Sequence, residues 1–132
     1  MIDKDLFEKG IKIRREVMGD ARVDTSMSDL DDFNRDFMEQ FITELGWGAV
    51  WGREGLSRKQ RSLLNLGMLA ALGRNLEFEG HFRGALNNGL SRKELREALL
   101  QITLYCGAPA GMEAFRIARR VLDEFEEELN SE

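Results

Sequence analysis

Residues 74–89 read Arg74-Asn-Leu-Glu-Phe-Glu-Gly-His-Phe-Arg-Gly-Ala-Leu-Asn-Asn-Gly89, and they contain the only histidine of the chain, His81. The segment predicts a helix that ends at Asn-Asn-Gly, because Gly89 can adopt the left-handed conformation that closes a helix without steric cost. In such a helix Glu77 and His81 lie one turn apart on one face, with Arg74 a further turn back. An acid, an imidazole and a guanidinium on one face can transfer a proton and hold an anion, but an ordinary solvated face has the same composition.

Helical spacing continues on both sides of this segment. Apolar residues recur every three or four positions in residues 3–18, 30–45, 56–73, 91–106 and from about residue 110 onward. No segment alternates apolar and polar residues in the manner of a strand, and proline occurs once. The sequence therefore predicts an all-α fold of about six helices.

Local signals mark several helix ends. Ser57-Arg-Lys-Gln60 and Ser91-Arg-Lys-Glu94 have the spacing of capping boxes, in which the first and last side chains bond each other's backbone N–H groups. Gly107-Ala-Pro109 predicts a break between the last two helices.

One apolar stripe is stronger than the others. It consists of Leu30, Phe33, Phe37, Phe41 and Leu45. The spacing is typical of a helix face that is buried in a core or in a subunit interface. Residues 63–72 are apolar nearly all round, as in a central buried helix. Helices this apolar in a small protein point to burial between subunits of a symmetric oligomer.

The segment Gly46-Trp-Gly-Ala-Val-Trp-Gly52 holds both tryptophans of the chain, four residues apart. Its three glycines predict a break in the preceding helix. Large aromatic side chains on such a connection either plug the edge of a core or form the wall of a ligand pocket. The sequence leaves both interpretations of Trp47 and Trp51 open.

Length and composition limit the class of protein. The 132 residues, 42% apolar and 33% charged, predict one globular domain spanning residues 1–132. The sequence has no apolar run long enough to span a membrane and no signal peptide, so we expect a cytoplasmic protein with no membrane partner. The net charge is −5, but residues 53–96 carry nine Lys or Arg and four acids. An acidic protein with a basic middle suits a small anion rather than nucleic acid.

The common motifs of cofactor and metal chemistry are absent. We find no glycine-rich phosphate loop, no GxSxG, no HExxH and no paired cysteines. A single histidine cannot build a multi-histidine site, so no metal and no cofactor are expected. Cys106, the only cysteine, is a candidate nucleophile if it faces His81, or otherwise an inert apolar residue.

Several phrases together resemble one family. They are Arg14-Arg15-Glu-Val, Gly19-Asp-Ala-Arg-Val-Asp24, Asp32-Phe-Asn34, Trp47-Gly…Trp51-Gly-Arg-Glu-Gly-Leu56, Arg61-Ser-Leu63, Glu77-Phe…His81…Arg83…Asn87-Asn-Gly89 and Tyr105-Cys-Gly-Ala-Pro-Ala110. Across nearly its whole length the chain resembles the 4-carboxymuconolactone decarboxylase family of the alkylhydroperoxidase-D-like superfamily. The resemblance implies an all-helical bundle that assembles as a trimer or hexamer.

The resemblance also relates this chain to a branch of thiol peroxidases with a Cys-x-x-Cys-x-x-x-His motif and an upstream glutamate. Alignment on His81 puts Arg74 and Glu77 at the positions of the two cysteines, and Ser62 at that of the upstream acid. Because both thiols are missing, disulfide-based peroxide reduction is excluded.

The activity implied by the resemblance is cofactor-independent decarboxylation of 4-carboxymuconolactone, a dianionic lactone, to 3-oxoadipate enol-lactone. This step belongs to the protocatechuate branch of the beta-ketoadipate pathway of aromatic degradation. His81 is then the general acid or the oxyanion donor, and Glu77 orients it. We expect the substrate's carboxylates to be bound among Arg61, Arg74 and Arg83, with Ser62 nearby and Trp47 and Trp51 as an apolar wall.

Two other functions fit the same residues. One is a decarboxylase or hydrolase that acts on a related anionic lactone, because pocket shape decides the substrate. The other is a non-catalytic helical oligomer that binds a small acid or a protein, with His81 as a core residue.

Overall fold

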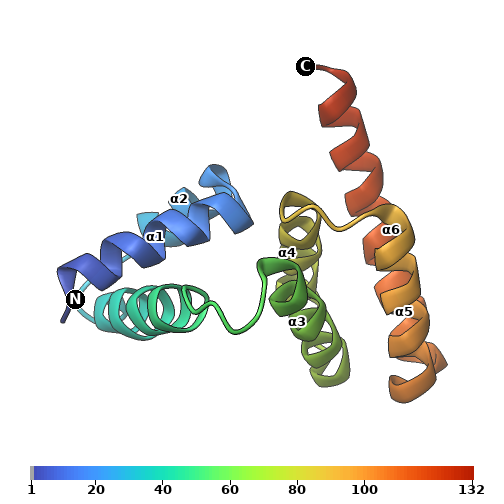
Figure 1. Ribbon diagram of the computed structural model, residues 1–132, viewed down its shortest axis with the longest axis horizontal. Helices are drawn as coiled ribbons and strands as arrows, with labels where there is room; N and C mark the ends of the chain where they lie inside the picture. The colour runs from blue at the N-terminus through green and yellow to red at the C-terminus, as the bar shows by residue number, and fades with distance from the viewer. Residues whose placement is uncertain (1) are drawn as a thin grey trace. The chain divides into compact units, whose positions relative to one another are not determined.

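The computed structural model describes residues 2–132, which form seven helices and no strand (Figure 1). The all-α prediction is therefore confirmed, with seven helices in place of about six. The chain divides into two compact units, Met1–Arg58 and Lys59–Glu132. Among the described residues, no helix combines the length and the apolar character needed to cross a bilayer.

The first unit contains α1 (Lys4–Met18), α2 (Asp20–Ser28) and η1 (Phe37–Val50). α1 starts where the Asp3 side chain accepts a hydrogen bond from the Leu6 N–H, and it ends at Gly19, whose φ is 90°. η1 is a π-helix, with a wider turn than an α-helix. The Thr43 hydroxyl donates to the Met38 carbonyl, five residues back, at 2.8 Å, and this spacing of five is that of the π-helix.

α1 and η1 pack through glycine. A Cβ atom on Gly10 would lie far inside van der Waals contact of the Thr43 carbonyl oxygen and 2.9 Å from the Gly48 nitrogen. A Cβ atom on Gly48 would lie 2.6 Å from the Leu6 carbonyl oxygen. The two backbones therefore approach to a distance that only glycine permits.

The consecutive arginines of α1 connect the other elements of this unit. Arg14 is half-buried and donates to the sulfur atoms of Met38 and Met27, at 3.3 and 3.8 Å. Burial, followed by the neighbouring charge of Arg15, lowers the pKa of Arg14. Hydrogen bonds from Arg15 to Asp24 and Asp20 of α2 raise the pKa of Arg15.

Two expectations for this unit were wrong, and α2 was not predicted. α2 buries only Val23, so its sequence shows no apolar periodicity. The helix expected from about Leu30 begins as η1 at Phe37. Gly46 and Gly48, two of the three glycines expected to break this helix, lie inside it, and Gly52 follows its end at Val50. Gly48 allows a contact with the Leu6 backbone of α1 that a larger residue would block.

The strong apolar stripe lies outside the core of this unit. Phe33 is 94% exposed, and Phe37, Phe41 and Leu45 are between 53% and 58% exposed. The buried positions of η1 are instead Thr43, Glu44, Trp47 and Gly48. Burial of the stripe in the core of the chain was thus a wrong expectation, and its burial in a subunit interface stays a prediction.

The second unit contains α3 (Arg58–Leu72, whose first residue closes the first unit), α4 (Asn75–Asn87), α5 (Arg92–Cys106) and α6 (Ala108–Asn130). The Ser91–Glu94 capping box at the start of α5 is confirmed. Gly89 and Gly107, with φ of 92° and 98°, end α4 and α5 as predicted. Pro109 lies in the first turn of α6, where its missing N–H has no helical partner to lose.

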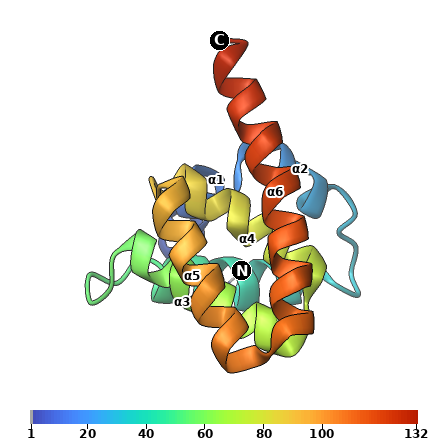
Figure 2. The same ribbon diagram turned by 90° about the vertical axis from the view of Figure 1, so that its right-hand side faces the viewer.

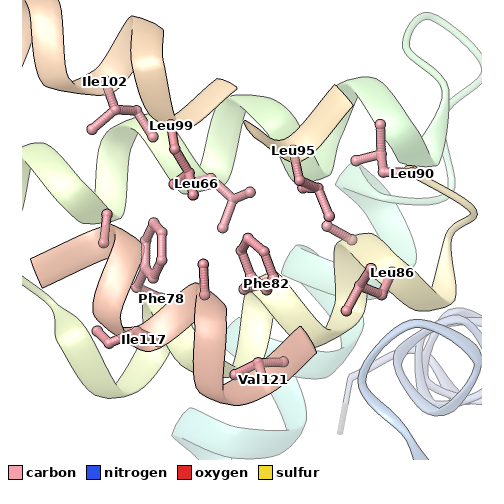
Figure 3. Packing of buried hydrophobic residues seen from close by; sticks show 13 residues of the cluster. Leu66, Phe78, Phe82, Leu86, Leu90, Leu95, Leu99, Ile102, Ile117 and Val121 are labelled. Atoms are coloured by element: carbon pink, nitrogen blue, oxygen red, sulfur yellow. The ribbon is translucent and has the colours of Figure 1, made fainter. Parts of the chain in front are cut away.

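The core of the second unit lies around α4. Phe78 and Phe82 of α4 stack with ring centroids 6.1 Å apart. Figure 3 shows them between the leucines of α5 and the branched residues of α6. α5 and α6 run side by side in both views (Figures 1 and 2), and the end of α6 extends past α5.

α3 differs from its prediction. Only Ser62 and Leu66 are buried in it, whereas Leu64, Met68 and Leu72 are exposed. The expectation of a central buried helix was therefore wrong for the single chain, because one side of α3 has no covering element within the second unit.

Candidate functional site

His81 lies on the flank of α4 rather than on its buried face. Phe78, Phe82 and Ala85 recur at spacings of four and three and are fully buried, which fixes the rotation of the helix. This rotation leaves His81 half-buried and Glu77 exposed. A half-buried imidazole is held by its neighbours while remaining open to a ligand.

Asn65 of α3 is the residue that the structure brings to His81. Its side-chain amide nitrogen lies 3.4 Å from Nδ1 of the imidazole. In this arrangement the neutral ring accepts at Nδ1 and carries its proton on Nε2. A rotated amide would present its oxygen to Nδ1–H of the imidazolium instead. An asparagine can therefore accompany the ring in both charge states, whereas a carboxylate favours the charged one.

Ser62 is fully buried and joins α3 to the end of α4. Its hydroxyl accepts a hydrogen bond of 2.8 Å from the side-chain amide of Asn88. Ser62 and Asn65 are three residues apart, so both project from one face of α3 toward α4. The two contacts, Ser62 with Asn88 and Asn65 with His81, set the position of α4 against α3.

The three predicted arginines lie in different surroundings. Arg61 is half-buried on α3, next to Ser62, and Arg74 is exposed at the N-terminal end of α4. Arg83 donates from both terminal nitrogens to the carboxylate of Glu128 on α6. Its guanidinium also lies over the Phe125 ring, 5.2 Å from the centroid. Arg83 thus already has a carboxylate partner within the second unit.

The two tryptophans belong to the first unit and stack on each other. Their ring centroids are 4.7 Å apart, with planes at 24°. Trp47 is buried with Ile13 and Val17 of α1. Trp51 is half-buried and lines a groove of about 550 Å³. Each interpretation of the segment therefore applies to a different tryptophan. Trp47 belongs to the core of the first unit, whereas Trp51 lines the groove.

That groove, which we call the Trp51 groove, has a basic lining. Its charged residues are Lys9, Lys12, Glu16, Arg53, Glu54 and Arg58. Arg58 pairs with Glu16 at 2.8 Å, and Lys9 donates to the Gly52 carbonyl at 3.4 Å. The cations outnumber the acids, so the groove favours an anion.

The arrangement of His81, Asn65 and Ser62 on α3 and α4 can be compared with known proteins. Residues 37–120 match the carboxymuconolactone decarboxylase family. The chain belongs to this family. The match includes α3 and α4 with His81, and it also includes both tryptophans.

Two named relatives cover almost the whole of this family member. A 4-carboxymuconolactone decarboxylase of Acinetobacter baylyi is 41% identical over 94% of this chain and 92% of its own length. A nitrosuccinic acid decarboxylase of Metarhizium robertsii is 42% identical over 93% of this chain and 85% of its own. An uncharacterized protein of Paracoccus denitrificans is 32% identical over 75% of this chain and 81% of its own. The two named relatives thus share a reaction type and differ in substrate.

Asn65 was missed by the sequence analysis of this family member. The signal was its spacing of three residues from Ser62, together with a polar side chain in an otherwise apolar helix. Lys9 and Lys12 were also missed, because their proximity to Trp51 depends on the packing of α1 against η1. Within residues 2–132, no three His, Cys, Asp or Glu side chains are grouped as metal ligands.

Proposed function

We propose that this protein decarboxylates 4-carboxymuconolactone to 3-oxoadipate enol-lactone without a cofactor. The observation that carries the proposal is the half-buried His81 of α4 with the Asn65 side-chain amide 3.4 Å from its Nδ1. Arg61 lies four residues before Asn65 on α3, and Arg74 lies seven residues before His81 at the start of α4. The Acinetobacter baylyi relative, which is similar over nearly its full length, supports the choice of substrate.

The substrate itself supplies the electron sink. When the bond between the ring carbon and its carboxylate breaks, carbon dioxide leaves and the electron pair stays on the ring. It moves through the ring alkene into the lactone carbonyl, which gives a dienolate. A proton added to the dienolate carbon completes the reaction. The protein therefore has to orient a dianion, stabilise charge on the carbonyl oxygen and supply one proton.

The residues of α3 and α4 match these three tasks in our proposal. His81 donates from Nε2, either to the carbonyl oxygen or to the dienolate carbon. Asn65 holds the ring as it changes charge. Glu77, one turn before His81 on the same helix face, orients the ring in this proposal. Ser62 positions α4 through Asn88.

The carboxylates of the substrate are bound by guanidinium groups in this proposal. Arg61 and Arg74 carry out this role, because a guanidinium bonds a carboxylate with two parallel N–H groups. Arg83 contributes only if it leaves Glu128. Trp47 and Trp51 belong to the first unit, and their role as an apolar wall against which a carboxylate loses water before it leaves stays a prediction.

The second candidate is decarboxylation of nitrosuccinate, which the Metarhizium robertsii relative favours. Nitrosuccinate is also a dianion, and one of its carboxylates is bonded to the carbon that bears the nitro group. Loss of that carboxylate places the electron pair on the nitro oxygens, so the sink again belongs to the substrate. The same set of a proton donor, an oxyanion donor and carboxylate clamps would serve both substrates.

Assembly into a homo-oligomer, a trimer or hexamer, is part of the proposal. The support comes from the exposed stripe of Phe33, Phe37, Phe41 and Leu45 and from the exposed leucines of α3. Contiguous apolar faces of this kind are typical of surfaces that meet another protein.

The test is turnover of both substrates by the purified protein in the presence of a chelator, with carbon dioxide release as the readout. The variants are His81→Gln and, as a control for the loss of a positive charge on the surface, Lys4→Gln. We expect enol-lactone formation by the wild type and by Lys4→Gln, and a loss of about 10²- to 10⁴-fold for His81→Gln. Turnover of nitrosuccinate alone would establish the second candidate. No turnover of either substrate, or full activity of His81→Gln, would contradict the proposal.

A further inference from the structure

A second cavity lies between α5 and α6. This α5–α6 groove has a volume of about 630 Å³, within the range of small-molecule sites. Its only residue from α4 is Phe82. His81, the preceding residue, is next to α3 instead. The groove is therefore separate from the site proposed for decarboxylation.

The floor of the α5–α6 groove is apolar. Phe82, Leu95 and Leu99 are buried beneath it, and Phe115 and Leu122 form its sides. An apolar floor contributes no binding free energy to a small hydrated anion. It does contribute binding free energy to a ligand that buries a hydrocarbon body against it.

The rim of the groove is basic. Its charged residues are Arg92, Lys93, Arg96 and Arg119, and no acid lines the cavity. Arg92 pairs with Glu126 at 2.8 Å, and Arg96 pairs with Glu97 at 3.5 Å. For Lys93 and Arg119 the structure shows no ion pair with any of residues 2–132. These two cations are positioned at the edge of an apolar cavity, and no direct ion pair within residues 2–132 compensates their charge.

We propose that the α5–α6 groove binds a monocarboxylate with an apolar body. The hydrocarbon part lies on Phe82, Leu99 and Phe115, and the carboxylate lies between Lys93 and Arg119. A neutral apolar molecule has no charge to pair with Lys93 and Arg119, and a small inorganic anion leaves the apolar floor exposed to water. Only a molecule that combines the two features matches the whole lining.

Calorimetric titration of the full chain with hexanoate, octanoate and 1-octanol tests this proposal. Octanoate should bind with one site per chain. It should bind about tenfold more tightly than hexanoate, because each added methylene that is buried contributes about fourfold. 1-Octanol, which has the same chain length and no charge, should bind at least about tenfold more weakly than octanoate.

Matched variants distinguish the effect of the two rim cations on octanoate binding from the effect of the overall charge of the protein. Lys93→Gln/Arg119→Gln removes two charges without breaking an ion pair and should weaken octanoate about tenfold or more. Lys4→Gln, an exposed lysine outside the groove, should leave octanoate binding unchanged. Phe115→Ser should reduce the difference between octanoate and hexanoate.

Three results would overturn the proposal. The first is an absence of octanoate binding at millimolar concentration, and the second is equal binding of octanoate and 1-octanol. The third is a double variant that still binds octanoate but has an altered mass in light scattering, which would assign the groove to contact between copies of the chain. Circular dichroism of each variant shows whether a lost affinity reflects a lost fold.

Discussion

The side-chain amide nitrogen of Asn65 on α3 lies 3.4 Å from Nδ1 of His81 on α4. α3 therefore supplies a polar neighbour for the imidazole ring. The amide can face the ring with its nitrogen or its oxygen, and it therefore suits both the imidazole and the imidazolium. In the proposed mechanism the ring gives up a proton in each cycle. A neighbour that tolerates both charge states keeps the ring in place during that change.

Replacing Asn65 with aspartate should shift the pH dependence of decarboxylation. A carboxylate next to His81 favours the imidazolium and raises its pKa. If His81 acts as the acid, the limb of kcat/KM that falls with rising pH should move upward by about one unit or more. Asn65→Leu, which has no charge, should lower kcat without that upward shift. Asn130→Asp, the same change at the end of α6, should leave the profile in place, and an equal shift there would contradict the role of Asn65.

Substitution of Arg61 and substitution of Arg83 should have different effects on KM. Arg61→Gln removes a proposed clamp and should raise KM more than it lowers kcat. Arg83→Gln breaks the pair with Glu128 on a partly exposed surface, so it should lower the free energy of unfolding by no more than about 1 kcal/mol and leave KM unchanged. Steady-state kinetics and urea unfolding of the two variants check this. A raised KM for Arg83→Gln would place that arginine at the substrate.

Gly10→Ala should destabilise the first unit. The added Cβ meets the Thr43 carbonyl oxygen and the Gly48 nitrogen, both backbone atoms that cannot rotate away. Overpacking of this kind costs about 1–3 kcal/mol in the free energy of unfolding. Gly67→Ala on α3 is the matched control, because a Cβ there has nothing within 4 Å. It should stabilise the protein by about 0.5–1 kcal/mol through helix propensity. Urea unfolding that finds the two variants alike would contradict the glycine contact.

Most helices were predictable because their signals are local. α3 begins next to Ser57, α4 ends just before Gly89, and α5 lies between Ser91 and Gly107, all of which are caps or breaks that the sequence identifies. α2 was not predicted, and the ends of η1 were misplaced, because tertiary packing determines where these two helices form. α2 buries one residue, and η1 places its glycines against α1 instead of ending at them.

The candidate site was predictable only in part, for a related reason. Spacing along α4 identified Glu77 and His81, because both belong to one helix. Asn65 belongs to a different helix, and its approach to His81 depends on tertiary packing. Glu128 lies 45 residues after Arg83, so their pairing depends on how α6 packs and had no local signal in the sequence.

The exposed phenylalanine stripe should control assembly. Phe37→Glu/Phe41→Glu places charges on side chains that are 55% and 58% exposed, so the fold of the chain should survive. A charge buried in an interface without a partner is strongly unfavourable, and the oligomer should dissociate. Light scattering coupled to gel filtration measures the mass. Asp36→Lys, a charge change beside the stripe, serves as the control. If the double variant keeps the wild-type mass, the stripe does not form the interface.

The capping box at the start of α5 should make stability depend on pH below the ordinary range of glutamate. The Glu94 carboxylate accepts the Ser91 backbone N–H at 3.0 Å, and this bond, followed by the Ser91 side chain, lowers the pKa of Glu94. A carboxyl group whose pKa is lower in the folded state stabilises that state above its unfolded pKa, about 4.3. That contribution is lost as the pH falls through the lowered folded pKa.

The Glu94→Gln variant separates this contribution from the hydrogen bond itself. Glutamine can still accept from the Ser91 N–H but has no proton to gain. The variant should therefore keep most of the stability at low pH and lose less than the wild type between pH 5 and pH 2. Urea midpoints at several pH values measure the difference. Glu127→Gln, an exposed glutamate on α6, should follow the wild type. If Glu94→Gln also follows the wild type at every pH, the capping carboxylate does not contribute to acid sensitivity.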